Sequence, residues 1–165
     1  MSRPTGNRHR VSATGAVPAP PPRVYQLLAD YRGEHPRIIP PRWLDGLEVE
    51  RGGVGAGTLI RFRLRLLGLT RQMRAEVSEP EPGRVLAETD LSSDGVTSFT
   101  VDPGPGGGTT LTIAIDFSTR GGVAGAVERW VVSRLLHPIL EAEVAQVAAY
   151  VREHPVAPST VRTTT

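Results

Sequence analysis

The titratable side chains with the most regular spacing are three arginines, which occupy every second position of segment 59–66. Successive side chains of a strand point to opposite faces, so the arginines share one face and the apolar residues between them share the other. Such a row could bind a polyanion, line a pocket or form the solvated side of a sheet. The arginines are Arg61, Arg63 and Arg65, and the apolar residues are Ile60, Phe62, Leu64 and Leu66.

Acidic residues on the flanking segments favour the solvated alternative. The same alternation places Glu48 and Glu50 beside the arginines on the preceding strand, and Arg74 and Glu76 on the following one. The chain has 19 basic residues, all arginine, against 17 carboxylates, and its net charge is +2. Cross-strand ion pairs on such a face are each worth only about 0.2–1 kcal/mol. We therefore expect a charge-balanced outer face and no nucleic-acid partner.

The four histidines do not predict a metal site, because none has a second ligand at a typical spacing and the chain has no cysteine. We expect no metal and no cofactor. Two roles stay open for His137. Inside a pocket, its ring could donate a proton or bind the carbonyl group of a ligand. Outside the pocket, it could cap the backbone carbonyl groups that Pro138 leaves without a hydrogen bond. Arg37 and Arg134 are the other candidate catalytic residues, since a guanidinium can polarise a carbonyl.

Two carboxylates, Glu88 and Asp90, lie in a strand whose inward face is ambiguous. Leu86 shares their parity, whereas Val85 and Ala87 have the opposite parity. Facing inward, the carboxylates would be candidate general bases with raised pKa values. Facing outward, they would complement the arginines, and this is the orientation that we expect.

The elements that position these residues follow from the hydrophobic pattern. A short strand is predicted over residues 10–17, and a helix begins at the prolines of segment 18–22, since proline is tolerated in the first helical turn. A short helix or turn covers residues 34–41. From 43 to 118, period-two alternation and turns rich in glycine and proline predict an antiparallel meander of six strands.

The segment 123–153 has apolar residues at spacings of three and four, which predicts a long helix with a kink or break near His137, caused by Pro138. This helix is the only element long enough to cover one side of a curved sheet. The result is an α+β fold with one domain over residues 10–153 and disordered polar tails at 1–9 and 154–165. A helix crossing a concave sheet leaves room for an apolar pocket.

Four segments carry motifs that belong together: VPAPPPRVYQLLAD at 17–30, GVGAGT at 53–58, EPEPGRVL at 79–86 and GGTTLTI at 107–113. With the order of elements, they resemble the START-like superfamily, also called Bet v 1-like or SRPBCC, and within it the polyketide cyclase/dehydrase and lipid-transport group. The resemblance covers residues 10–153. It implies a helix-grip fold, in which the sheet wraps around the C-terminal helix and encloses a hydrophobic cavity.

The resemblance implies binding of a hydrophobic or amphipathic small molecule, such as a lipid, quinone, steroid-like or polyketide compound. Two alternatives stay open: a polyketide cyclase/dehydratase that acts on a poly-β-keto intermediate, and an interaction protein of toxin–antitoxin type. The motifs are structural, so whether a reaction is catalysed is undecided. The residues expected to bind the ligand are Ile60, Phe62, Leu64, Met73, Phe99, Ile113, Ile115, Trp43, Trp130 and Val131.

No segment has the length of apolar sequence that a membrane span requires, and the amino terminus lacks the apolar core of a signal peptide. We therefore expect a cytoplasmic protein without a membrane span. A monomer or weak homodimer is expected.

Overall fold

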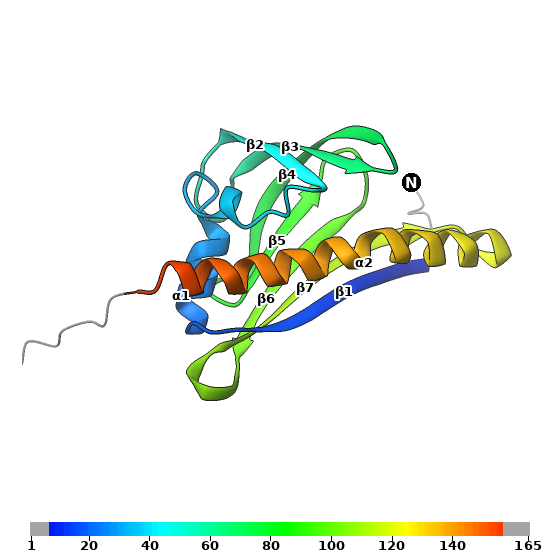
Figure 1. Ribbon diagram of the computed structural model, residues 1–165. Coiled ribbons are helices and arrows are strands. Elements are labelled where there is room, and N and C mark those ends of the chain that lie inside the picture. Colours follow the sequence, from blue (N-terminus) through cyan, green and yellow to red (C-terminus); the bar gives the residue numbers. More distant parts are fainter. Residues whose placement is uncertain (1–6, 157–165) are drawn as a thin grey trace, which may run out of the picture.

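The computed structural model describes residues 7–156 (Figure 1). Residues 1–6 and 157–165 of the predicted tails lie outside the described residues, and residues 7–9 already belong to the first strand. The elements are β1 (Asn7–Val17), α1 (Pro21–Ala29), the 3-10 helix η1 (His35–Arg37), β2 (Leu44–Arg51), β3 (Leu59–Leu66), β4 (Leu69–Glu81), β5 (Val85–Asp90), β6 (Val96–Pro103), the 3-10 helix η2 (Pro105–Gly107), β7 (Thr109–Thr119) and α2 (Gly122–Glu153).

The strands form one seven-stranded sheet in the order β1-β7-β6-β5-β4-β3-β2. Every neighbouring pair is antiparallel. The sheet curves around α2, which runs lengthwise across it (Figure 1), and α2 packs against β1 and β7. This arrangement confirms the predicted α+β helix-grip fold.

Strand β3 shows how the alternating sequence sets the two faces of the sheet. Ile60 is only 1% exposed and pairs with Ala75 of β4, and Phe62 pairs with Met73. The arginine at position 63 is exposed on the opposite face. The apolar parity therefore faces α2, as the alternation requires when one side of a sheet is buried.

A glycine-rich loop holds the end of α1 against the sheet. The Tyr31 amide donates to the Gly53 carbonyl at 2.9 Å, and the Gly55 amide donates to the Ala29 carbonyl at 3.0 Å. Gly53 has a φ of +143°, and a Cβ added there would lie 2.5 Å from Nε of Arg32. This position therefore needs glycine, and the loop fixes where Tyr31 and the following helix η1 lie.

Helix α2 is one uninterrupted helix of 32 residues that contains Pro138. Of the kink or break expected near His137, the break does not occur, since the helix continues through Pro138 to Glu153. The two halves of α2 differ in burial. Leu140 and Val147 of the C-terminal half are 2% and 0% exposed, whereas Val123 at the beginning is 83% exposed.

Candidate functional site

A cavity of about 300 Å³ lies between the concave face of the sheet and α2. Its walls come from η1, from strands β2 to β7 and from α2, and most of the lining residues are apolar. Five of the residues predicted to bind a ligand line this cavity. They are Ile60, Phe62, Leu64, Met73 and Ile115.

Three other predicted wall residues lie elsewhere in the fold. Phe99 and Ile113 pair across β6 and β7 and are 1% and 0% exposed, but they belong to the hydrophobic core and do not line the cavity. Helix α1 packs against β6 and helps to fill this part of the concave face. Trp43 is half-buried beneath the guanidinium of Arg42, 5.1 Å from the ring centroid, and is not part of the wall.

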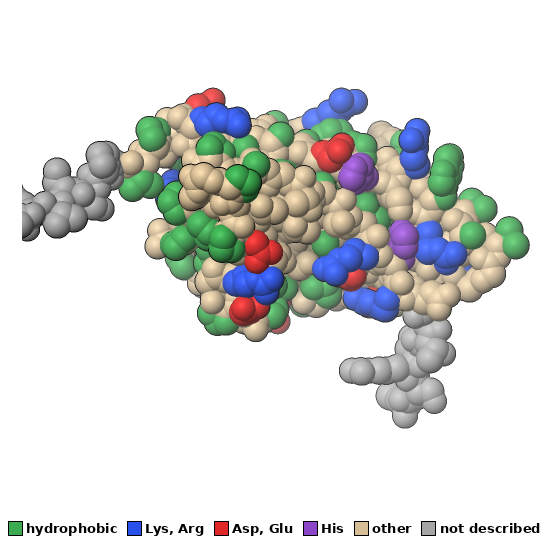
Figure 2. All heavy atoms as spheres, turned by 90° about the horizontal axis from the view of Figure 1, so that it is seen from below, with side chains coloured by type: hydrophobic (Ala, Val, Ile, Leu, Met, Phe, Trp, Pro, Cys, Tyr) green, Lys and Arg blue, Asp and Glu red, His purple; other side chains and the backbone are tan. Residues whose placement is uncertain are grey.

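The first half of α2 turns the remaining predicted residues to solvent. Trp130 and Val131 are 65% and 39% exposed, and Arg134 is exposed with its guanidinium 6.0 Å from the Trp130 ring centroid. Figure 2 shows hydrophobic side chains exposed at the end of the molecule where α2 begins, with charged side chains of both signs over the rest of that face. Instead of Trp130 and Val131, α2 contributes Val132 and Leu136 to the cavity wall.

His137 and Arg37, the other candidate catalytic residues, also lie outside the cavity wall. The His137 ring is on the β1 side of α2, where Nδ1 is 3.0 Å from the Ser12 carbonyl oxygen and Nε2 is 3.1 Å from Oε1 of Glu141. Arg37 is exposed at the end of η1. The pocket role considered for His137 is therefore not the arrangement observed.

The cavity has a polar inner end formed by Tyr31, His35, Glu88 and Glu143, which we call the inner polar cluster. The Tyr31 hydroxyl donates to Oε1 of Glu88 at 2.6 Å, and Nε2 of His35 lies 3.7 Å from the same oxygen. The Tyr31 and His35 rings stack with centroids 4.3 Å apart. His35, Glu88 and Glu143 line the cavity, and Tyr31 supports Glu88 from behind.

Burial determines the protonation of the first two members of the cluster. It lowers the pKa of His35, which favours the neutral ring. Nδ1 of that ring carries the proton, because it lies 2.6 Å from the Leu28 carbonyl oxygen, which can only accept. Burial, together with the charge of Glu88, raises the pKa of Tyr31 well above its usual range, so the phenol stays a hydrogen-bond donor.

Glu143 is the member of the cluster that α2 contributes. It is 5% exposed and lines the cavity, and no side-chain hydrogen bond among the described residues involves it. Burial and the negative charge of Glu88 raise its pKa to about 8. At neutral pH the Glu143 side chain is therefore mainly an uncharged carboxylic acid that faces the cavity.

The orientation expected for Glu88 and Asp90 was wrong, because both side chains line the cavity. Leu86, which shares their parity, is fully buried opposite Phe99 of β6 and fixes the inward face of β5. Asp90 accepts hydrogen bonds from the backbone and hydroxyl of Ser92 and from other groups of the β5–β6 turn. Burial alone would raise the pKa of Asp90, but these hydrogen bonds outweigh burial and the pKa is lowered.

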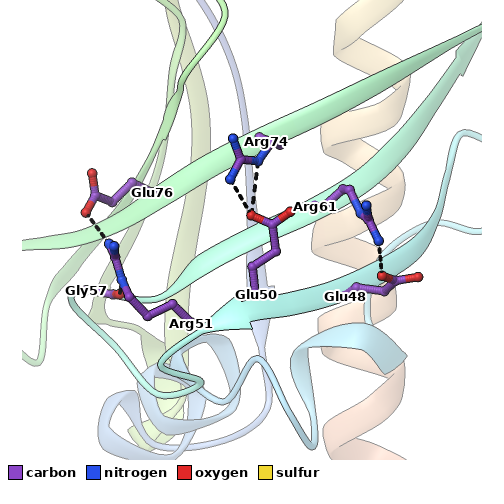
Figure 3. A network of polar contacts seen from close by, with 7 residues as sticks. All are labelled: Glu48, Glu50, Arg51, Gly57, Arg61, Arg74 and Glu76. Atoms are coloured by element: carbon purple, nitrogen blue, oxygen red, sulfur yellow. Dashed lines mark hydrogen bonds and ion pairs between the residues drawn. The ribbon is translucent and has the colours of Figure 1, made fainter.

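The arginine row belongs to the opposite side of the sheet, where arginines of β2, β3 and β4 form ion pairs. Figure 3 shows those of Arg51, Arg61 and Arg74. Arg61 pairs with Glu48, Arg74 donates to Glu50 at 2.5 Å, and Arg51 donates to Glu76 at 2.8 Å. Arg63 and Arg65 both pair with Asp45. We call these residues the outer charged network, and their pairing agrees with a charge-balanced outer face. The network comprises Asp45, Glu48, Glu50, Arg51, Arg61, Arg63, Arg65, Arg74 and Glu76.

The position of Glu143 in the helical periodicity is a sequence signal for its role. Glu143 follows Leu140 by three residues and precedes Val147 by four, so it falls within the apolar stripe of α2. A carboxylate at a buried helical position is unusual and indicates a specific role. His35 and Tyr31 have no comparable periodic signal, since they come from the irregular segment after α1.

A curved antiparallel sheet that encloses a cavity against a long C-terminal helix defines the helix-grip class of proteins. A family model described as polyketide cyclase/dehydrase and lipid transport matches residues 8–152. The chain belongs to this family.

Solved structures share the fold over most of their length. The solution structure of KanY protein is 25% identical, with a TM-score of 0.76, and the match covers 88% of this chain and 99% of KanY. The Zhui aromatase/cyclase from Streptomyces sp. R1128 is 20% identical, with a TM-score of 0.74 and coverage of 93% and 99%. Major latex-like protein 151 from Panax ginseng is 14% identical, with a TM-score of 0.65 and coverage of 88% and 98%. No curated protein matched the sequence.

Two further features of the described part of the chain bear on function. Within residues 7–156, no three His, Asp or Glu side chains are grouped so that they could hold a metal ion. None of the helices described has the length and apolar character needed to cross a membrane.

Proposed function

We propose that the protein binds a hydrophobic or amphipathic small molecule in the cavity between the sheet and α2, with the polar end of the ligand at the inner polar cluster. The observation that carries this proposal is an apolar cavity of about 300 Å³ that ends in buried polar side chains. Small-molecule sites commonly have volumes of about 300–1,000 Å³, with mostly apolar walls and a few polar groups that orient the ligand.

Burial of apolar ligand surface supplies the affinity in this proposal. Each Å² of apolar surface removed from water contributes about 25 cal/mol, so a ligand in contact with Phe62, Met73 and Ile115 gains affinity from every wall. The inner polar cluster then selects among ligands, because a ligand that leaves buried polar groups unpaired loses affinity.

The test introduces the same bulky side chain on the two faces of β3. Leu64→Trp fills the cavity, whereas Arg63→Trp places the ring on the outer face. The probe is N-phenyl-1-naphthylamine, whose fluorescence rises in an apolar site. We expect Leu64→Trp to weaken its binding by about tenfold or more and Arg63→Trp to leave it unchanged. Equal affinity in both variants and the wild type would place the probe outside the cavity and contradict the proposal.

The inner polar cluster also favours a second candidate, a cyclase/dehydratase acting on a poly-β-keto compound. Aldol closure needs a base that removes an α-proton and an acid that protonates a carbonyl oxygen. Glu88 and Glu143 present a carboxylate and a carboxylic acid to the same cavity, with His35 beside Glu88. The protein would position the chain and supply these two groups.

Turnover of a poly-β-keto thioester to an aromatic product, followed by absorbance, tests this second candidate. We expect Glu88→Gln to lower the rate by about 100-fold or more, because the base is lost while the shape is kept. His137→Ala and Arg37→Ala are matched controls that should not change the rate, since neither side chain lines the cavity. Turnover that survives Glu88→Gln would remove Glu88 from the mechanism.

A further inference from the structure

Glu143 is a buried carboxyl group for which the protein provides no partner. It is 5% exposed, comes from the C-terminal half of α2 and lines the cavity, and none of the side-chain hydrogen bonds within residues 7–156 involves it. No side-chain oxygen or nitrogen of the described residues is both fully enclosed and without a partner, so the Glu143 oxygens reach the space of the cavity. Buried polar groups in proteins nearly always have a hydrogen-bond partner, protein or water. An unpaired carboxyl that lines an apolar cavity therefore indicates a partner that enters the cavity.

The other charged and titratable groups around the cavity are already engaged. From η1, His35 binds the Leu28 carbonyl, and from β5, Glu88 accepts the Tyr31 hydroxyl. Asp90, also from β5, is bound by groups of its own turn. From β4, Arg74 pairs with Glu50 and Arg71 donates to the hydroxyl of Ser92. Glu143 is thus left for the ligand.

The state of Glu143 limits the chemistry of this ligand. An uncharged carboxylic acid has one O–H donor, so its natural partner is a hydrogen-bond acceptor. An anionic group beside Glu143 is disfavoured, because the Glu88 carboxylate is close by and its basic neighbour among the described residues is His35, which burial keeps neutral. The two arginines of the cavity wall are held elsewhere, Arg71 by the Ser92 hydroxyl and Arg74 by Glu50. An uncharged carbonyl oxygen satisfies the donor without adding charge.

We propose that Glu143, as a carboxylic acid, donates a hydrogen bond to a carbonyl oxygen of the ligand and thereby selects uncharged carbonyl compounds. This inference rests on the proposed binding function and names the class of ligand at the same cavity. Glu143 is in this respect a specificity-determining residue. The carbonyl-bearing end of the ligand lies at the inner polar cluster, and its apolar body lies toward Phe62 and Leu136.

Binding should depend on pH in a direction that identifies this contact. The donor exists only while Glu143 is protonated, and the pKa of Glu143 is about 8. Carbonyl binding is therefore full at about pH 6 and weakens as the pH rises above about 8. A ligand with a protonated amine would behave in the opposite way, because it would bind best to the ionised side chain.

Three probes of nearly equal shape test the inference: 2-acetylnaphthalene, 2-isopropylnaphthalene and 2-naphthamidine, whose amidinium group stays charged over this pH range. Their affinities are measured by fluorescence at about pH 6 and about pH 9.5 for the wild type, Glu143→Gln and Glu143→Leu. The matched control is Glu141→Gln, which changes an exposed carboxylate two residues away on the same helix. Circular dichroism establishes that each variant is folded.

We expect the ketone to bind the wild type about tenfold more tightly than the hydrocarbon at about pH 6, and to lose this preference at about pH 9.5. Glu143→Leu should abolish the preference, Glu143→Gln should keep it at both pH values because an amide still donates, and Glu141→Gln should behave as the wild type. Equal affinity of ketone and hydrocarbon in the wild type would overturn the inference and leave the proposed function standing. Preference for the amidinium that increases with pH would assign the site to cations instead. Failure of all three probes to bind would overturn the proposed function as well.

Discussion

The outer charged network and the inner polar cluster use carboxylates in opposite ways. On the outer face, Glu48, Glu50 and Asp45 each face at least one arginine, and the pairs are open to solvent and salt. In the cavity, Glu88 has a tyrosine and a neutral histidine as neighbours, and Glu143 faces the cavity without a hydrogen bond to any described residue. Ionised side chains on the outer face stay solvated and paired, so they cost little free energy. Burying carboxyl groups in the cavity is costly, and their presence there indicates a function.

Regular spacing in the sequence is therefore a poor guide to where the chemistry lies. The arginine row is conspicuous because every second residue is charged, and this regularity is what a solvated strand face needs. The inner polar cluster is assembled from η1, β5, α2 and the segment after α1, so its members are far apart in the sequence. Only the fold brings them together.

Glu143 should make the free energy of unfolding depend strongly on pH. Its pKa is about 8 in the folded protein against an ordinary 4.5, so the folded state holds a proton that the unfolded state has lost between these values. The stabilising contribution of protonated Glu143 is complete below about pH 4.5 and is lost as the pH rises toward about 8. At about 1.4 kcal/mol per pH unit, this loss amounts to about 3–5 kcal/mol.

Urea unfolding of the wild type and Glu143→Gln across this range measures the effect. We expect the difference in the free energy of unfolding between the two proteins to change with pH over that window and to be constant above about pH 8. Glu76→Gln, on the outer face, is the control and should show no such change in this window. Parallel curves for the wild type and Glu143→Gln would show that Glu143 titrates normally.

A smaller effect is expected from removing one hydroxyl from the inner polar cluster and, for comparison, one that contacts a partly exposed carboxylate elsewhere in the fold. Tyr31→Phe leaves a buried Glu88 oxygen without its donor, which should cost about 2 kcal/mol of stability. In Tyr25→Phe the lost partner is Glu79, which keeps the Ala56 amide at 3.0 Å and contact with water. We expect a cost of about 1 kcal/mol or less there, measured by the same unfolding experiment. Equal costs would mean that the two sites are equally solvated.

The fold could be predicted from the sequence because local patterns determine it. Alternation, turn residues and the apolar stripe of 123–153 each define one element, and an antiparallel meander leaves few ways to join them. The inward face of β5 could not be predicted in this way, because Val85 and Ala87 have one parity and Leu86 has the other. Only the pairing of Leu86 with Phe99 of β6 decides which side faces inward.

The direction in which α2 faces could not be predicted from the stripe alone. At about 100° per residue, His137 lies about 60° to one side of Leu140 and Glu143 about 60° to the other. Both positions flank the same apolar stripe, so the pattern does not say which of them meets the cavity. Packing of α2 against β1 and β7 decides this, and it turns Glu143 inward and His137 toward Ser12.

The smallest expected effect belongs to the outer charged network. Asp45 accepts from both Arg63 and Arg65, so Asp45→Asn removes two ion pairs with one substitution. Because both arginines are about half exposed, at 53% and 49%, water solvates them once the pairs are lost. The stability should fall by only about 0.5–1 kcal/mol at low salt, and the difference should shrink as salt is added. Ligand binding should not change, because Asp45 does not line the cavity. Thermal unfolding at two salt concentrations, with binding of N-phenyl-1-naphthylamine in parallel, measures both. A loss of probe binding in Asp45→Asn would show that the outer network and the cavity are coupled through β2 and β3, and the division drawn between the two regions would then fail.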